Sequence, residues 1–193
     1  METNLLATFE ASVVPALTGA ASELADAREE KLRDGVALSL PLLLGAIVRK
    51  CTAAGGPGDV HRMLTAESID AGMLDSIDTP LADDGRALAT SSLGANLLSS
   101  LFGAATDSVN RQVAQRAGLE LDEARRLLAL LTALMFVFLK RWIEQHDLDA
   151  AALTAQLLEQ RPVPSSSNTA CIAWIDSTAL FGGVSRPSRK ACM

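Results

Sequence analysis

The sequence predicts an all-helical protein whose core is built around two apolar helices. Of its 193 residues, 49% are hydrophobic, Ala and Leu dominate, only 4% are aromatic and Tyr is absent. Ala and Leu favour helices, whereas β-branched and aromatic residues favour strands. Residues 36–48 and 127–139 are two apolar stretches of 13 residues each. Helices that are apolar on all sides and of this length lie at the centre of a soluble core, so a multihelical fold is expected.

The first half of the chain is expected to contain two long helices. Residues 4–22 have a helical pattern that Pro15 interrupts. Asp26 and Glu29 have the spacing of a capping box at the start of a second helix. Pro41 lies inside this second helix and is expected to bend it or to split it in two. Its apolar positions include Leu32, Val36, Leu40, Leu43 and Ile47.

A loop and shorter elements are expected to follow. The stretch AAGGPGD at 53–59 is the clearest loop in the sequence. Short helices are expected around 60–66 and 71–77, and TPLADDG at 79–85 has the composition of a polar connector.

The second half is expected to contain four helices with recognisable ends. One covers about 87–102 and a second covers 105–117, with Gly103 and Gly118 suited to the helix ends. Acidic residues open the third, which runs to about Gln145. The fourth spans roughly 149–160, with Asp149 as its N-cap.

Three regions are expected along the chain. An N-terminal helical subdomain covers 1–80, and a C-terminal helical subdomain covers 81–160. From Arg161 the sequence changes to PVPSSSNT, and residues 161–193 are expected to form a flexible or loosely docked tail, anchored through Trp174.

The two halves also suggest a tandem duplication. LPLLLGAIVRK at 40–50 aligns without gaps with LTALMFVFLKR at 131–141, and both end in an apolar residue followed by two basic ones. An Asn-Leu-Leu triplet precedes each stretch at nearly the same distance along the chain, at 4–6 before the first and at 96–98 before the second. Duplication is the interpretation we favour, and chance alignment of Leu- and Ala-rich helices is the alternative.

These stretches resemble the YidB-like bacterial family of unknown function. The resemblance covers roughly 3–160 and rests on PLLLG at 41–45, LL at 97–98, LFG at 101–103, the Leu-rich run from 127 and the closing helix at 148–160. It implies a multihelical fold with two small subdomains. It does not imply an activity, because none is established for the family. Some relatives of this family are fused to an OmpA-type peptidoglycan-binding domain, which hints at a role in the cell envelope.

The sequence departs from the family pattern in its second half. Thr132 and Ala133 stand where Pro is common, and Phe136 stands where Gly is common. These residues suggest that the second half packs differently.

Charge and cysteine content restrict the partners and the compartment. The net charge is −6, with 7 basic and 14 acidic residues in 1–90 against 10 basic and 9 acidic in 91–193. An acidic chain is repelled by phosphate backbones, so nucleic acid is an unfavourable partner. Cys51, Cys171 and Cys192 form no disulfide framework and are expected to be reduced in the cytoplasm.

A membrane span is not expected. A helix of 13 residues is roughly 20 Å long, against about 30 Å of hydrocarbon to cross. The first ten residues also lack the basic region and apolar stretch of a secretory signal.

The sequence indicates no catalytic residue, metal site or cofactor. His61 and His146 stand without a visible set of partners, and no GxSxG motif supports a Ser–His–Asp triad. The glycines at 55–58 lack the Lys-Ser/Thr of a phosphate-binding loop and are interpreted as a turn. Acidic pairs lie at helix starts and turns, where carboxylates act as caps: Glu29/Glu30, Asp83/Asp84 and Asp147/Asp149.

One basic patch is a weak candidate site for an anion or nucleic acid. It consists of Arg111, Arg116, Arg125 and Arg126, which fall on neighbouring predicted helices. The competing interpretation is a solvated charged face.

We therefore expect a non-enzymatic structural or protein-interaction module that binds an unknown protein or self-associates in the cytoplasm. The alternatives are nucleic-acid binding through the arginines, an enzyme with an unfamiliar site around His61 or His146, and a periplasmic or envelope-associated role.

Overall fold

The computed structural model describes residues 8, 9, 11, 26–53, 55–66, 69 and 84–159. Within them the chain forms helices and no strand, which confirms the predicted all-helical fold class. The elements are α2 (Asp26–Thr52), α3 (Gly56–Leu64), α4 (Asp84–Phe102), a 3-10 turn (Gly103–Ala105), α5 (Thr106–Ala117), α6 (Leu121–His146) and α7 (Ala150–Glu159).

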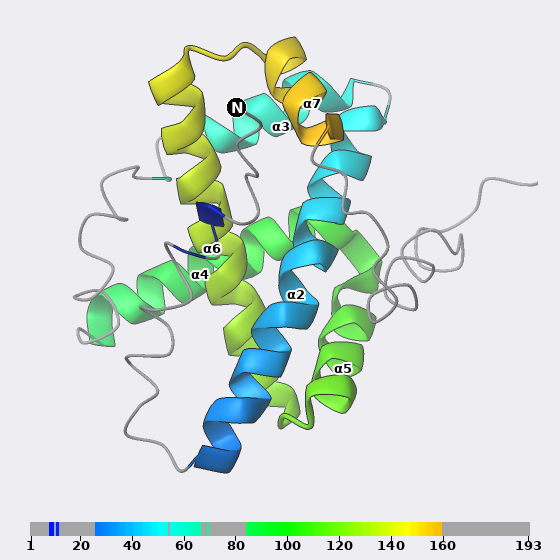
Figure 1. Ribbon diagram of the computed structural model, residues 1–193, viewed down its shortest axis with the longest axis vertical. Helices are drawn as coiled ribbons and strands as arrows, with labels where there is room; N and C mark the ends of the chain where they lie inside the picture. Colours follow the sequence, from blue (N-terminus) through cyan, green and yellow to red (C-terminus); the bar gives the residue numbers. More distant parts are fainter. Residues whose placement is uncertain are drawn as a thin grey trace, which may run out of the picture.

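Helix α6 is the centre of the described fold (Figure 1). It packs most extensively on α4, and it also contacts α5, α2 and α3. Helix α2 runs alongside α6, while α5 packs against both of these long helices. The short helices α3 and α7 lie against each other and against α2 at the upper end of the molecule in Figure 1.

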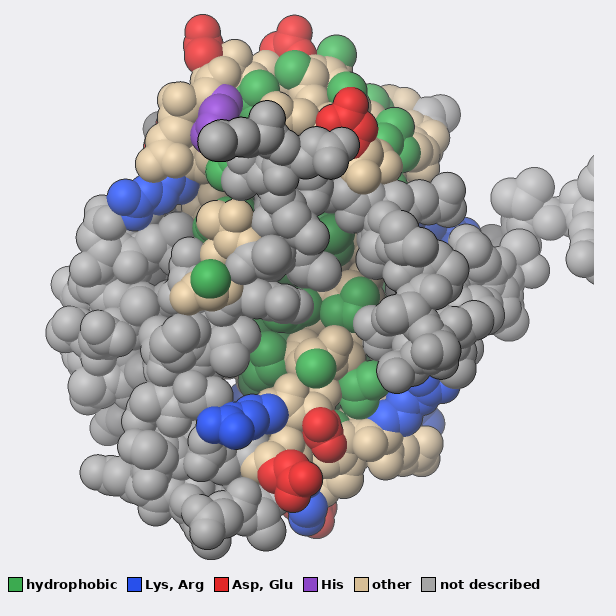
Figure 2. All heavy atoms as spheres, in the orientation of Figure 1, with side chains coloured by type: hydrophobic (Ala, Val, Ile, Leu, Met, Phe, Trp, Pro, Cys, Tyr) green, Lys and Arg blue, Asp and Glu red, His purple; other side chains and the backbone are tan. Residues whose placement is uncertain are grey.

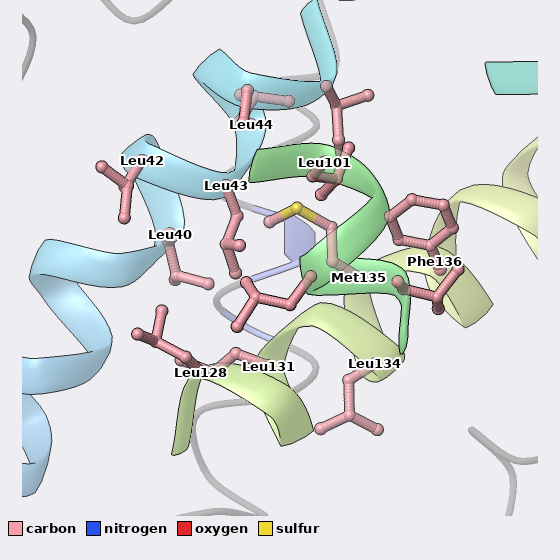
Figure 3. Close-up of a cluster of buried hydrophobic side chains, with 14 of the residues drawn as sticks. Leu40, Leu42, Leu43, Leu44, Leu101, Leu128, Leu131, Leu134, Met135 and Phe136 are labelled. Atoms are coloured by element: carbon pink, nitrogen blue, oxygen red, sulfur yellow. The ribbon is translucent and has the colours of Figure 1, made fainter. Parts of the chain in front are cut away.

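The two predicted apolar stretches form one shared core. Leu40 and Leu43 of α2 are buried among Leu101 of α4 and Leu131 and Met135 of α6 (Figure 3). In the predicted apolar positions of α2, Leu32 is half-buried and the other four are buried. The predicted core around two apolar helices is therefore confirmed, whereas the tandem duplication and the subdomain boundary at residue 80 stay predictions.

Helix α2 is continuous through Pro41, so the alternative of two separate helices is wrong. Proline removes one backbone hydrogen bond and disfavours a helix interior by about 3 kcal/mol. Pro41 itself is buried, and the flanking Leu40, Leu42 and Leu43 are buried in the shared core. Tertiary packing on both sides of the proline outweighs this local cost.

The loop predicted at 53–59 is shorter in the structure. Helix α3 begins at Gly56, so Pro57, Gly58 and Asp59 form its first turn. Proline is tolerated there because the first backbone N–H groups of a helix have no partner within the helix. Gly55 turns the chain with a φ of 77°, and a Cβ on Gly56 would clash with the Lys50 carbonyl oxygen.

Most helix ends in the second half are confirmed. Gly103 and Gly118 adopt φ values of 55° and 65°, which glycine tolerates at a helix end. Glu120 and Glu123 form a capping box at the start of α6, where the Glu120 N–H donates to Glu123 Oε2 at 3.1 Å. This box explains why acidic residues precede the longest apolar run.

The crossing of α4 and α6 depends on a small residue. Gly94 is buried, and a Cβ at this position would clash with the carbonyl oxygen of Ala129. The two backbones are therefore in direct contact, which only glycine permits.

The residues that depart from the family pattern lie in α6. Thr132, Ala133 and Phe136 are all buried.

One described helix, Glu30–Thr52, is long and apolar enough to cross a membrane by length and composition. It is longer than the 13-residue apolar stretch within it. Of its most apolar 18-residue stretch, 67% is buried inside the fold. Core helices of soluble proteins have the same properties.

Several predictions lie outside the described residues. Of the helix over 4–22, only residues 8, 9 and 11 are described, and these are helical. Most of the connector at 79–85 also lies outside the described residues. The other predicted features that lie outside them are the helix around 71–77, Pro15, the side chains of Asp26 and Glu29, Asp83, Cys171, Cys192, and the tail at 161–193 with Trp174.

Candidate interaction surface on helix α7

Helix α7 is held on the body of the protein by its inner face. Leu153 and Leu157 are fully buried in the core, where α7 contacts α2 and α3. The helix starts at an N-cap, because the Asp149 side-chain oxygen Oδ1 accepts a 2.7 Å hydrogen bond from the Ala152 N–H. The predicted N-cap role of Asp149 is confirmed.

The polar side chains on the flanks of α7 are used within the fold. Gln156 Oε1 accepts a 2.9 Å hydrogen bond from Trp142 Nε1, which ties α7 to α6. Thr154 Oγ1 donates to the Ala150 carbonyl at 2.7 Å and also hydrogen-bonds with Cys51. Both polar groups therefore stabilise the attachment of α7 to its neighbours.

The outer face of α7 is apolar and exposed. It consists of Ala151, Ala155 and Leu158, whose spacings of four and three residues place them on one side of the helix. Leu158 is 43% exposed and is the large hydrophobic residue that the described part of the chain leaves exposed. Helices that are apolar all round are normally buried, so this outer face has the character of a contact surface. We call these three residues the α7 outer face.

Acidic residues lie at both ends of α7 and at the end of α6. The stretch 142–159 contains Glu144, Asp147, Asp149 and Glu159, all exposed, and no Lys or Arg. Figure 2 shows apolar side chains between acidic ones at this upper end of the molecule. On the neighbouring α3, the cation Arg62 forms an ion pair with Asp59.

His146 belongs to an aromatic column that ends near this surface. Its ring stacks on Trp142 with centroids 4.1 Å apart, and Trp142 stacks on Phe138 at 6.2 Å. Phe9 packs edge-on against Phe138 at 5.3 Å. His146 Nδ1 also hydrogen-bonds with the Trp142 carbonyl at 2.9 Å, so this imidazole has a place in the packing at the end of α6.

The buried Cys51 is a protected thiol at the end of α2. Burial raises the pKa of the Cys51 thiol above its ordinary value, and the hydrogen bond with Thr154 opposes this effect. A raised pKa keeps the thiol protonated and therefore weakly nucleophilic. That the thiol is reduced in the cell stays a prediction.

The predicted arginines lie on the exposed surface of two adjacent helices. Arg111 and Arg116 belong to α5, and Arg125 and Arg126 belong to α6. Arg111 Nε donates to the Asp107 carbonyl at 3.2 Å. Arg125 forms ion pairs with Asp107 at 3.5 Å and with Asp122 at 3.2 Å, so two carboxylates lie within this basic group.

The remaining candidate groups are scattered over the described elements. His61 is half-buried in α3, on a different helix from His146. In the described part of the chain, no three His, Cys, Asp or Glu side chains lie close enough together to hold a metal ion.

The sequence predicts α7 as a helix but does not by itself indicate its outer face. The signal was present in the spacing of Ala151, Ala155 and Leu158 opposite Leu153 and Leu157. Both faces are apolar, so the pattern alone did not show which one the core covers.

The arrangement of the described helices defines an all-helical protein with a surface helix that is apolar on its outer side. A family model described as a bacterial protein of unknown function (DUF937) matches residues 8–141, and the chain belongs to this family. The predicted resemblance to the YidB-like family is thereby confirmed. No significant match was found among curated proteins or among solved structures. Helix α7 lies beyond the matched residues.

Proposed function

We propose that this bacterial chain is a non-enzymatic protein-interaction module that contacts another protein through the α7 outer face. The exposure of Ala151, Ala155 and Leu158 on a helix whose inner face is already buried carries the proposal. Contiguous exposed apolar surface with a polar rim is typical of interaction sites. We place this action in the cytoplasm.

The support for this surface comes from the division of roles within α7. Leu153, Leu157, Thr154 and Gln156 attach the helix to the fold. The outward residues make no comparable contribution, because Leu158 keeps 43% of its surface in solvent. A second protein that covered this face would remove apolar surface from water, which is the main favourable term in association.

Nucleic-acid binding through the arginines has less support. Arg125 is paired with Asp107 and Asp122, and these carboxylates would also repel a phosphate backbone. The α7 outer face has no comparable conflict with a protein partner.

The test is site-specific photo-crosslinking in living bacteria. A photo-reactive amino acid replaces Leu158, the large residue of the α7 outer face, and the matched control replaces Gln115, which is exposed on α5. We expect a discrete protein adduct from position 158 that is absent from position 115 and is lost when Ala155→Gln is added. Equal adducts from both positions, or none from position 158, would contradict the proposal.

A further inference from the structure

We propose that the partner covers the α7 outer face with a helix that carries Lys or Arg on both sides of an apolar stripe. This inference rests on the function proposed above and adds the chemistry of the partner. The shape of the face, its charge and the poor fit of other occupants support this partner.

The shape of the face favours a helix. Ala151 and Ala155 are small, so the backbone of a partner helix can approach α7 closely between them. Leu158 stands at the end of this row as the large apolar side chain. An amphipathic helix places apolar residues at intervals of three and four, which matches the spacing on α7.

The charge of the surroundings favours a basic partner. Glu144, Asp147, Asp149 and Glu159 are exposed, and residues 142–159 supply no cation. Two cations of the neighbouring helices already have contacts elsewhere. Arg62 of α3 is paired with Asp59, and Lys50 of α2 donates to the Ser100 carbonyl at 3.1 Å. Complementary charges across an interface speed association and select the partner.

The α7 helix of a second copy does not fit this surface. Asp149 lies before the first residue of α7 and Glu159 is its last, so both ends of the helix are acidic. Two α7 helices would oppose like charges in either orientation, which is unfavourable.

The C-terminal sequence of the chain is also a poor match. The apolar stretch 171–181 contains Asp176 and no Lys or Arg. The next cation, Arg186, comes only after Gly182 and Gly183, and Pro187 follows it. In this sequence, turn-forming residues therefore separate the apolar residues from the basic ones.

The experiment measures peptide binding to the full chain at low salt. The probes are three synthetic helical peptides of about 18 residues, a length that can form an isolated helix. All share one apolar stripe of Leu and differ only in Lys, Gln or Glu on the flanks. We expect the Lys peptide to bind about tenfold more tightly than the Gln peptide and the Glu peptide to bind least.

Three variants separate shape from charge. Ala155→Gln adds bulk between the helices and should weaken binding of the Lys and Gln peptides alike. The double variant Asp149→Asn and Glu159→Gln removes two charges and retains an N-capping residue, so it should weaken only the Lys peptide. Gln115→Ala on α5 is the control and should bind as the original chain does.

Specific outcomes would overturn the inference. Equal affinities for the Lys and Gln peptides would refute the basic partner. Binding of the Lys peptide that Ala155→Gln leaves unchanged would refute this location. Photo-crosslinking at position 158 of the isolated chain would refute the proposed occupant if the adduct mapped to a second copy or to residues 161–193. Loss of the adduct in bacteria would instead refute the proposed function itself.

Discussion

Helices α6 and α7 are both apolar on opposite sides, but the fold covers them differently. Helix α6 is enclosed by α2, α3, α4 and α5, and residues 131–139 are buried without interruption. Helix α7 is covered only on the side of Leu153 and Leu157, while Ala151, Ala155 and Leu158 face outward. The apolar sequence of α6 is explained by the core of this chain. The outer apolar residues of α7 are not explained by that core, which is why we assign them to a partner.

This contrast separates stability from binding. Removing buried apolar atoms costs the transfer free energy of those atoms and leaves a cavity. Removing exposed apolar atoms changes the free energy of unfolding little, because they are solvated in both states. Substitutions that break the contacts of α6 should therefore unfold the protein, whereas substitutions on the α7 outer face should affect only association.

The largest effect is expected where α4 meets α6. Gly94→Ala places a Cβ against the Ala129 carbonyl oxygen, so the two helices must move apart. We expect a loss of about 3 kcal/mol or more in the free energy of unfolding, measured by urea denaturation. Ser92→Ala, at an exposed position of α4, is the control and should change little. Unchanged stability in Gly94→Ala would show that the helices do not cross at this distance.

The comparison is sharpest at two adjacent leucines of α7. Leu157 is fully buried and Leu158 is 43% exposed. We expect Leu157→Ala to destabilise the protein by about 2 to 4 kcal/mol and Leu158→Ala by less than about 0.5 kcal/mol. Thermal and urea denaturation of both variants measure the difference. Similar losses from the two substitutions would mean that Leu158 belongs to the core of this chain, and the proposed surface would fail.

A smaller loss is expected at a lysine that connects α6 with the segment after α3. Lys140 is half-buried, and its Nζ donates to the carbonyls of Ile69 at 2.6 Å and Ala66 at 3.3 Å. Lys140→Met keeps an apolar side chain and leaves two carbonyls without this donor, which should cost about 2 kcal/mol. Arg126→Met, at an exposed position of the same helix, is the control. Urea denaturation provides the measurement, and equal stability of the two variants would contradict this role of Lys140.

Lys140 also shows which parts of the fold the sequence could predict. Helix starts and ends depend on neighbours in the chain, so Asp149, Gly103 and Gly118 were recognisable from local patterns. The bond from Lys140 to Ile69 joins residues 71 positions apart, and no local pattern indicates it. The glycine of the α4–α6 crossing is equally non-local, because Ala129 lies far along the chain.

The two prolines differ from the sequence prediction for separate reasons. Proline is disfavoured in a helix interior, as at Pro41, but is tolerated in a first turn, as at Pro57. At Pro41, burial of the flanking residues keeps α2 continuous, and at Pro57 the first turn of α3 needs no donor from that residue. The candidate surface on α7 was missed for a further reason. Periodicity shows which residues share a face, whereas only packing shows whether that face is covered.

The smallest effect on stability is expected at the start of α7. Asp149→Ala removes the acceptor of the Ala152 N–H and should lower the free energy of unfolding by about 1 kcal/mol, measured by thermal denaturation. Asp149→Asn retains a capping oxygen and should be nearly as stable as the original chain. These two variants also distinguish two ways in which binding of the partner can be lost. Asn at this position removes a charge from the rim of an intact helix, whereas Ala also frays the first turn, where Ala151 lies. If both variants bound the Lys peptide as tightly as the original chain, neither the charge of Asp149 nor the order of this turn would contribute to association.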